Sequence, residues 1–171
     1  KGSSLSEESL AKLENLAKQN KAQKRNIEQL LELTKRYYVQ EKNIKLANDL
    51  EILAREQQRI SESDLNNSKE NQEKLSDQFD QFKKEMDSLE EENKSLKKPF
   101  DIFNEDGGED EITIDQKEAV DKLEQKEIDL AKKKQKAAAV KMKELSSKMR
   151  SSQNSQQAQT LKANVESLRQ I

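Results

Sequence analysis

The densest group of side chains able to hold a cation lies in one acidic stretch near the middle of the chain. It runs through Asn104, Glu105, Asp106, Gly107, Gly108, Glu109, Asp110 and Glu111. Calcium needs about six to eight oxygen ligands at fixed spacing. The alternating pattern of a calcium loop is missing here, because Ile102 stands four residues before Asp106, where the first acidic ligand belongs. We interpret the stretch as an acidic loop in water, and we expect no metal and no cofactor.

The side chains that most often carry out catalysis near neutral pH are missing. The chain has no histidine and no cysteine, so the commonest general base and the usual zinc ligands are lacking. Carboxylates are abundant, but acid–base catalysis needs a pocket that moves two pKa values apart. Helices that pack along a narrow apolar stripe form no such pocket, and the sequence has neither a glycine-rich phosphate loop nor a nucleophile elbow. We predict that the chain is not an enzyme.

A run of lysines is the candidate contact for an anion: Lys132, Lys133, Lys134 and Lys136. Proteins that bind nucleic acid usually add arginines and stacking aromatic residues, and this stretch has no aromatic residue. Residues 61–115 carry a net charge of −11 and residues 116–171 a net charge of +6, so an acidic helix would compete for these lysines. We expect helix pairing or solvation here, and no nucleic acid.

Three apolar residues follow closely after the only proline of the chain. Phe100, Ile102 and Phe103 would lie at the tip of a hairpin, where apolar residues either fold back onto the protein or dock into a partner. We favour folding back, and we keep these three residues as the candidate partner contact. Tyr37 and Tyr38 are expected to pack within the bundle, with one hydroxyl reaching solvent.

The elements that position these residues are long helices with apolar residues at heptad spacing, which keeps one stripe facing a partner. One seam runs through residues 46, 50, 53, 57 and 60, after an apolar pattern that begins at Ile27. The last seam along the chain runs from Val120 to Met149, and its spacing slips once between Leu123 and Ile128. Between them a longer seam keeps spacings of 3 and 4 without a slip: Leu65, Ser68, Gln72, Leu75, Phe79, Phe82, Met86, Leu89, Asn93 and Leu96.

These seams predict a single elongated helical domain over residues 1–171. The expected helices are 5–20, 24–61, 67–97, 115–150 and 158–171, with a turn near 61–67 and a loop over 98–114 that holds the proline. Residues 18–26 are almost wholly polar, and the sequence leaves helix and linker open there. Charged residues make up 39% and hydrophobic residues 31%, which favours helices that bury a narrow stripe over a compact globule. The predicted class is all-α, an elongated antiparallel helical bundle or coiled-coil hairpin.

Three stretches of the chain carry a resemblance: LLELTKRYYVQEK (30–42), NKSLKKPFD (93–101) and LRQI (168–171). They resemble a family of large, membrane-anchored, coiled-coil-rich proteins of unknown function from Bacteroidetes. The resemblance implies an internal helical segment of a cell-envelope protein, on the periplasmic side of the membrane. Some members of that family are labelled as ATPases, but this segment holds no phosphate-binding loop.

The favoured hypothesis for function is a non-enzymatic scaffold or spacer that acts through helix–helix contacts, with itself or with other parts of a larger protein. Seams of this kind serve equally within one chain and between two copies, so a homodimer is one expected arrangement. One alternative is a charged surface that binds anionic lipid or nucleic acid through the Lys132–Lys143 face. Another is a coupling arm of an enzyme that lies outside this segment. Membrane contact is expected only through parts outside the segment.

Overall fold

The described part of the chain is helical, with no strand. The computed structural model describes residues 7–101 and 108–169. Its four helices are α1 (Glu7–Glu62), α2 (Lys69–Lys94), α3 (Gly108–Glu124) and α4 (Ile128–Arg169). The all-α prediction is confirmed.

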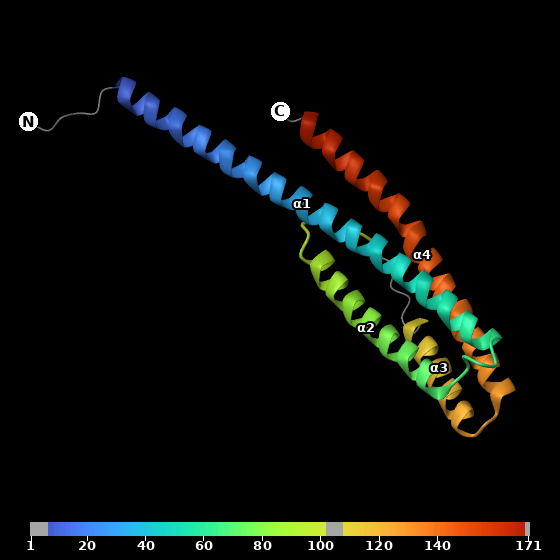
Figure 1. Cartoon of the computed structure of the whole chain (residues 1–171). Helices are drawn as coiled ribbons and strands as arrows, with labels where there is room; N and C mark the ends of the chain where they lie inside the picture. Colours follow the sequence, from blue (N-terminus) through green and yellow to red (C-terminus); the bar gives the residue numbers. More distant parts are fainter. Residues whose placement is uncertain (1–6, 102–107, 170–171) are drawn as a thin grey trace, which may run out of the picture.

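The helices pack as a ring in which neighbours run in opposite directions (Figure 1). α1 packs against α2 and α4, and α3 packs against the same two helices. Two ion pairs mark the direction of α2 along α1. Lys45 meets Glu85 at 3.2 Å, whereas Lys42, nearer the start of α1, meets Glu92 at 2.9 Å, nearer the end of α2. The chain therefore turns back at three connections rather than at one central loop.

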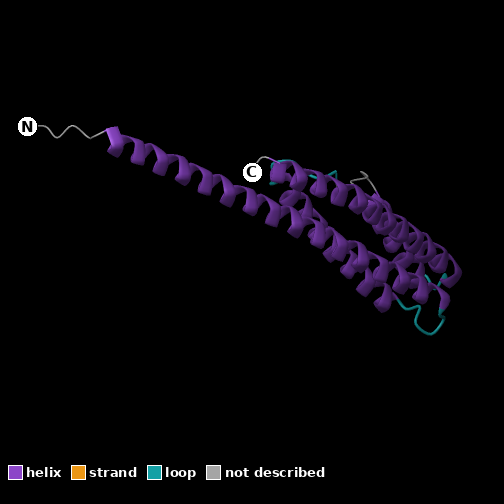
Figure 2. Cartoon of the chain, turned by 90° about the horizontal axis from the view of Figure 1, so that it is seen from above, coloured by secondary structure: helices purple, strands orange, loops and turns teal. Residues whose placement is uncertain are grey.

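The N-terminal part of α1 extends beyond the ring (Figures 1 and 2). We call residues 10–35 of α1 the arm. Residues 10–28 are all exposed, and the helix continues through residues 18–26 without a break. The polar stretch that sequence left open is therefore helix, and the two predicted helices 5–20 and 24–61 are one. The C-terminal part of α4 also leaves the ring and is continuous through the predicted link near residue 155.

Most of the hydrophobic core comes from the predicted seams, but in the seam from Val120 to Met149 Ile128 is exposed and Val120 is only half-buried. In α2 and just after it, the seam residues that are buried are Gln72, Leu75, Phe79, Phe82, Met86, Leu89, Asn93 and Leu96. The rings of Phe79 and Phe82 stack with centroids 5.7 Å apart. Leu65 and Ser68 were also predicted in this seam, but both are exposed because α2 begins only at Lys69.

A layer of buried glutamines crosses the core. The Nε2 group of Gln57 donates to Oε1 of Gln72 at 2.7 Å, and Nε2 of Gln72 donates back to Oε1 of Gln57 at 3.1 Å. Nε2 of Gln116 donates to the same Gln57 oxygen at 3.1 Å. Nearby, Gln135 donates to Oδ1 of Asn67 at 2.8 Å. Because buried amides need partners, this layer favours the one register in which all three glutamines meet.

The turn between α1 and α2 lies close to its predicted place. α1 ends at Glu62, and Ser68 caps α2 by accepting a hydrogen bond from the backbone N–H of Asn71 at 3.2 Å. The expected helix began at residue 67, two residues before the start of α2. The predicted loop 98–114 is longer than the loop in the structure, because α3 begins at Gly108 and residues 109–114 are helical. The acidic first turn of α3 suits a helix N-terminus, where negative side chains meet the positive end of the helix dipole.

The predicted helix 115–150 is divided in two. α3 ends at Glu124 with a Schellman motif, in which Glu127 N–H bonds to the carbonyl of Lys122 at 2.9 Å and Lys126 N–H to that of Leu123 at 3.1 Å. Lys126 has a φ of 60°, the left-handed conformation that glycine usually supplies at this position. The slip in the heptad pattern before Ile128 marks this turn. A turn was not predicted at this slip because no glycine or proline accompanies it.

Candidate interaction site

The lysine run of α4 lies against acidic side chains. Lys132 pairs with Asp64, and Lys134 pairs with Glu118 and, at 3.4 Å, with Asp115. The pairing with Asp64 lowers the pKa of that carboxyl, and the hydrogen bonds that Lys134 donates to Glu118 and, with a smaller effect, to Asp115 raise the pKa of Lys134. Lys141 also reaches Asp115, at 2.8 Å. Asp115, at which the predicted helix 115–150 began, is therefore buried inside α3 as an acceptor for two lysines.

Two lysines of the run remain in solvent. Lys133 and Lys136 are exposed and form no ion pair with any residue that the structure describes. Of the four predicted lysines, Lys132 and Lys134 are therefore in ion pairs with carboxylates, and Lys133 and Lys136 are in solvent. Two lysines one turn apart beside an acidic helix make a poor site for an extended anion, since phosphate binding relies on many cationic contacts.

Phe100 folds back into the core. Its side chain is only 3% exposed, and the guanidinium of Arg36 lies 4.0 Å above its ring. Asn93 holds its backbone on both sides, accepting from Phe100 N–H at 2.8 Å and donating to its carbonyl at 2.9 Å. Phe100 is therefore not free to contact a partner, whereas Ile102 and Phe103 lie outside the described residues.

Arg36 fastens this connection to α1. Its Nη1 donates to the carbonyl of Lys98 at 2.6 Å, and Glu32 accepts the backbone N–H of Lys97 at 2.9 Å. Burial lowers the pKa of Arg36, and the nearby Glu32 carboxylate partly offsets this. A buried arginine over an aromatic ring had no signal in the heptad pattern, because the pattern treats Arg36 as a polar position.

The acidic stretch is only partly described. Gly108 to Glu111 form the first turn of α3, and residues 104–107 lie outside the described residues. Burial is the main cause that raises the pKa of Glu109, and Asp87 adds to it. Over the described ranges, no group of three or more acidic side chains is arranged to hold a metal ion.

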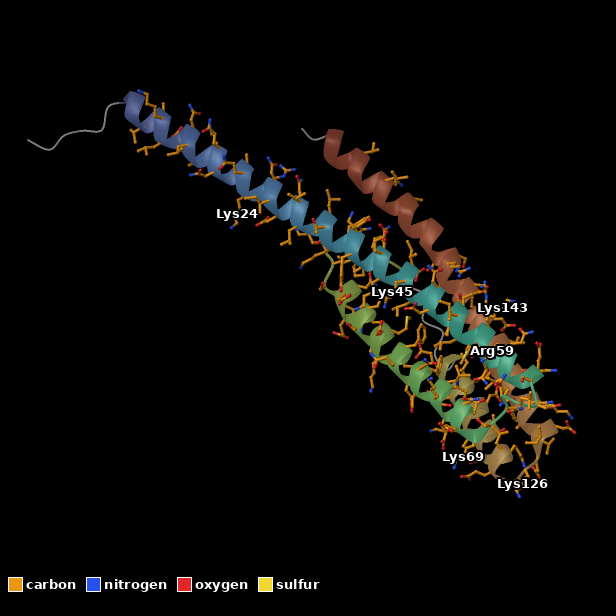
Figure 3. All side chains as sticks on the ribbon, viewed as in Figure 1. Lys24, Lys45, Arg59, Lys69, Lys126 and Lys143 are labelled. Atoms are coloured by element: carbon orange, nitrogen blue, oxygen red, sulfur yellow. The ribbon has the colours of Figure 1, made fainter. Side chains whose placement is uncertain are left out.

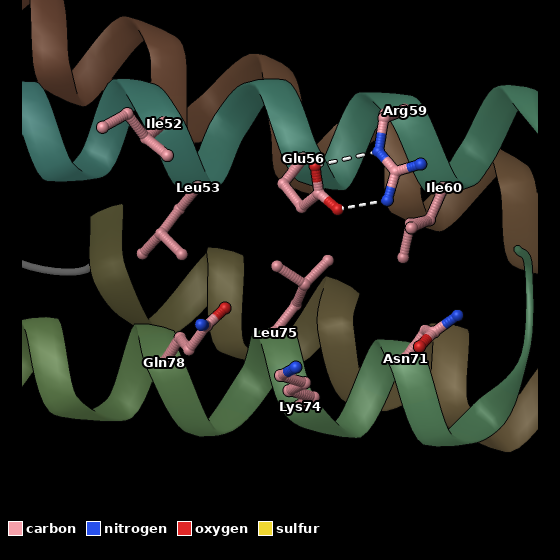
Figure 4. A pocket seen from close by; sticks show the side chains of 9 residues that line it. All are labelled: Ile52, Leu53, Glu56, Arg59, Ile60, Asn71, Lys74, Leu75 and Gln78. Atoms are coloured by element: carbon pink, nitrogen blue, oxygen red, sulfur yellow. Dashed lines mark hydrogen bonds and ion pairs between the residues drawn. The ribbon is translucent and has the colours of Figure 1, made fainter.

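An open groove follows the outer side of α1 and α2 (Figure 4). It encloses about 350 Å³. Arg59 Nε donates to Glu56 at 2.9 Å on one edge, and this bond lowers the pKa of Glu56. The groove has an apolar floor and a polar rim, and its lining residues are Ile52, Leu53, Glu56, Arg59, Ile60, Asn71, Lys74, Leu75 and Gln78. No set of polar groups converges in it as a catalytic or cofactor site requires.

An unpartnered apolar stripe lies on α1, most of it on the arm. Eight large side chains are between 48% and 68% exposed: Leu10, Leu13, Leu16, Ile27, Leu30, Leu31, Tyr37 and Tyr38. Figure 3 shows the side chains of the arm, Lys24 among them, projecting with no other helix alongside the outer part. The prediction that Tyr37 and Tyr38 pack within the bundle is wrong. Leu161 and Val165, on the projecting end of α4, are also exposed.

This stripe does not continue the seam that fills the core. The core frame of α1 runs through Arg36, Val39, Asn43, Leu46, Leu50, Leu53, Gln57 and Ile60, and its members are buried or half-buried. The arm has a different frame with the same spacings of 3 and 4, which we call the arm frame: Leu10, Leu13, Ala17, Asn20, Lys24, Ile27, Leu31, Thr34 and Tyr38. Sequence reasoning merged the two frames because both are apolar near residues 30–46. The signal that separates them is the break in spacing between Tyr38 and Val39.

No helix in the described ranges is long and apolar enough to cross a membrane. Comparison with protein families, with curated proteins and with solved structures finds no match to the chain.

Proposed function

We propose that the chain is a non-enzymatic structural and interaction module that acts through helix–helix contacts. The observation that carries the proposal is the exposed stripe of the arm. Contiguous exposed apolar surface marks an interaction site. The arm presents such a face at the spacing that suits another helix.

In this proposal the ring of helices is the base, and the arm is the working surface. The base is an elongated antiparallel bundle that fixes where the arm projects, as a spacer requires. The resemblance of residues 30–42, 93–101 and 168–171 to a Bacteroidetes family supports a place within a larger cell-envelope protein, on its periplasmic side.

The alternative of a charged surface has less support. Binding of anionic lipid or nucleic acid through α4 needs lysines that are free to contact phosphates, and Lys132 and Lys134 are held by carboxylates. A coupling arm of an enzyme elsewhere in a larger protein would use the same exposed stripe, so it is a version of the favoured function.

Site-specific photocrosslinking in cells that express the protein tests the proposal. A photoreactive residue is placed at Ile27 or Leu31 on the stripe, and the matched control is at Lys18 or Ala22, which are exposed on the same arm but lie outside the arm frame. We expect a defined protein adduct from the stripe positions and little from the controls. Equal labelling of all four positions, or no adduct at all, would refute an interaction module.

A further inference from the structure

We propose that the arm pairs with the arm of a second copy of this chain, antiparallel, about a two-fold axis between residues 20 and 24. This inference rests on the proposed function, because it names the partner of the exposed stripe. It follows from the arm frame, from the charges beside that frame and from the place where the bundle begins.

The first step is the register of the apolar residues. In an antiparallel pair of helices, the two alternating frame positions of one helix meet those of the other in layers. If Leu13 is placed opposite Leu31 of the second copy, Ala17 meets Ile27 and Leu10 meets Thr34. The two-fold axis repeats each layer, so every apolar frame residue from 10 to 31 faces another or the methyl-bearing Thr34. The overlap covers residues 10–34, about 37 Å of helix.

The second step is the charge along one flank of the frame. Glu14 directly follows the frame residue Leu13. The residues at the same place in the next three heptads are Lys21, Glu28 and Lys35. All four are exposed, and none forms an ion pair with a residue in the described ranges. In an antiparallel pair this flank lies beside the same flank of the partner. The register set by Leu13 and Leu31 brings Glu14 near Lys35, and Lys21 near Glu28.

This alternation is what makes the arm complementary to itself. A half-turn about the axis exchanges each acidic position with a basic one, so all four flank contacts in the dimer are attractive. A parallel pair would instead bring this flank beside the opposite flank, which holds Leu16, Gln23 and Leu30 and no charge. Flank charges set the orientation of paired helices. They therefore favour the antiparallel arrangement.

The middle of the overlap is polar. Asn20 lies opposite Lys24 in the two central layers, and these residues explain why the stripe is interrupted between Ala17 and Ile27. Polar residues at frame positions weaken a pair of helices but fix its register. A shift by one heptad would place Lys24 against Ile27, so the central layers select the proposed alignment.

The overlap ends where the ring of helices begins. Residue 10 of the second copy reaches Thr34, and Arg36 is the first frame residue that belongs to the core. The connection at Lys97 and Lys98 is bound to Glu32 and Arg36, on the core-frame side of α1, so it leaves the arm frame open. Each copy therefore keeps its own bundle, and the dimer is joined only through the arms.

A charge-swap series with the whole chain tests the inference by sedimentation equilibrium over about a hundredfold range of concentration. Lys21→Glu places a second carboxylate beside that of Glu28, and Glu28→Lys places a second ammonium group beside that of Lys21. Each single variant should raise the dissociation constant of the dimer about tenfold at low salt. The double variant Lys21→Glu with Glu28→Lys restores both attractions and should recover the original constant, as should an equimolar mixture of the two single variants.

Lys18→Glu is the matched control, because Lys18 is exposed on the same arm but lies off both the frame and its charged flank. It should leave the constant unchanged. All of these residues lie outside the bundle, so circular dichroism should show equal helicity.

A monomer at every concentration would overturn the inference, as would a double variant no stronger than the single ones. If the chain is monomeric but the stripe crosslinks to a different protein, the second-copy inference fails and the proposed function stands. If the stripe yields no adduct at all, both fail.

Discussion

The buried glutamine layer supports a prediction that ranks three similar substitutions. Gln57, Gln72 and Gln116 are each at most 2% exposed, but they differ in how many bonds they hold. Gln57 takes part in three, Gln72 in two and Gln116 in one. Methionine has nearly the shape of glutamine without its amide, so Gln→Met variants keep the packing and remove only hydrogen bonds.

The expected cost follows from the polar atoms that are left without a partner. Gln57→Met leaves three polar atoms without a partner: Oε1 and Nε2 of Gln72, and Nε2 of Gln116. Gln72→Met leaves only Nε2 of Gln57, because the Gln57 oxygen keeps its bond from Gln116. Gln116→Met leaves none in this layer. At about 1–3 kcal/mol for each orphaned buried group, partly offset by the removal of a buried amide, we expect losses of about 3, about 1–2 and less than about 0.5 kcal/mol.

Urea unfolding followed by circular dichroism, at one protein concentration, measures these differences. The dependence of the unfolding free energy on urea should stay constant across the series, since the surface exposed on unfolding is the same. A triple variant with methionine at all three positions should be close to the original or more stable, because no amide is then left unpaired. Equal losses for Gln57→Met and Gln116→Met would refute the reasoning and assign the cost to packing.

Three further predictions concern single positions. Phe100→Ala should lower the unfolding free energy by about 3–5 kcal/mol, because it empties a core site and removes the ring beneath Arg36, and urea unfolding would show it. Lys126→Gly should raise the melting temperature, by the equivalent of about 1 kcal/mol, since glycine adopts a φ of 60° without strain. Glu109 has a raised pKa in the folded state, so its stability contribution is present at low pH and is lost as pH rises through that pKa. Glu109→Gln should therefore stabilise the protein at pH 7 by less than about 1 kcal/mol and have no such effect in acid, and urea unfolding at the two pH values would show the difference.

The parts of the fold that sequence could predict are those in which one physical signal dominates. The seam from Gln72 to Leu96 is regular and apolar, and the structure buries all eight residues. The all-α class follows from the same regularity, since a spacing of 3.5 residues has no counterpart in a strand. The turn after α1 was also within reach, because residues 61–68 are rich in side chains that compete for backbone hydrogen bonds.

Other features depend on contacts between elements that are distant in sequence. The turn at Lys126 uses no glycine, so only the slip in spacing marks it, and a slip can equally be a bulge or an imperfect repeat. Gln57 and Gln116 are far apart in the chain; Gln57 alone looks like a weak point of its seam, and Gln116 precedes the seam that was predicted from Val120. Charged side chains usually lie at the surface, but the turn of chain around Pro99 places Phe100 beneath Arg36.

The arm differs from a frayed helix end because the arm frame and the core frame of α1 are apolar over different parts of the helix. Continued toward the N-terminus, the core frame meets Glu32, Gln29 and Arg25, which would bring charge into a bundle. Continued toward the C-terminus, the arm frame meets Glu41 and Lys45, both exposed. Each stripe therefore stops being apolar where the other takes over, between Thr34 and Val39. A helix that only lost its neighbours would keep one frame throughout. Because elongation from the packed part of α1 avoids the cost of nucleation, the base can hold the arm helical while its apolar face is open. The chain thus separates the stripe that folds it from the stripe that is left for contact.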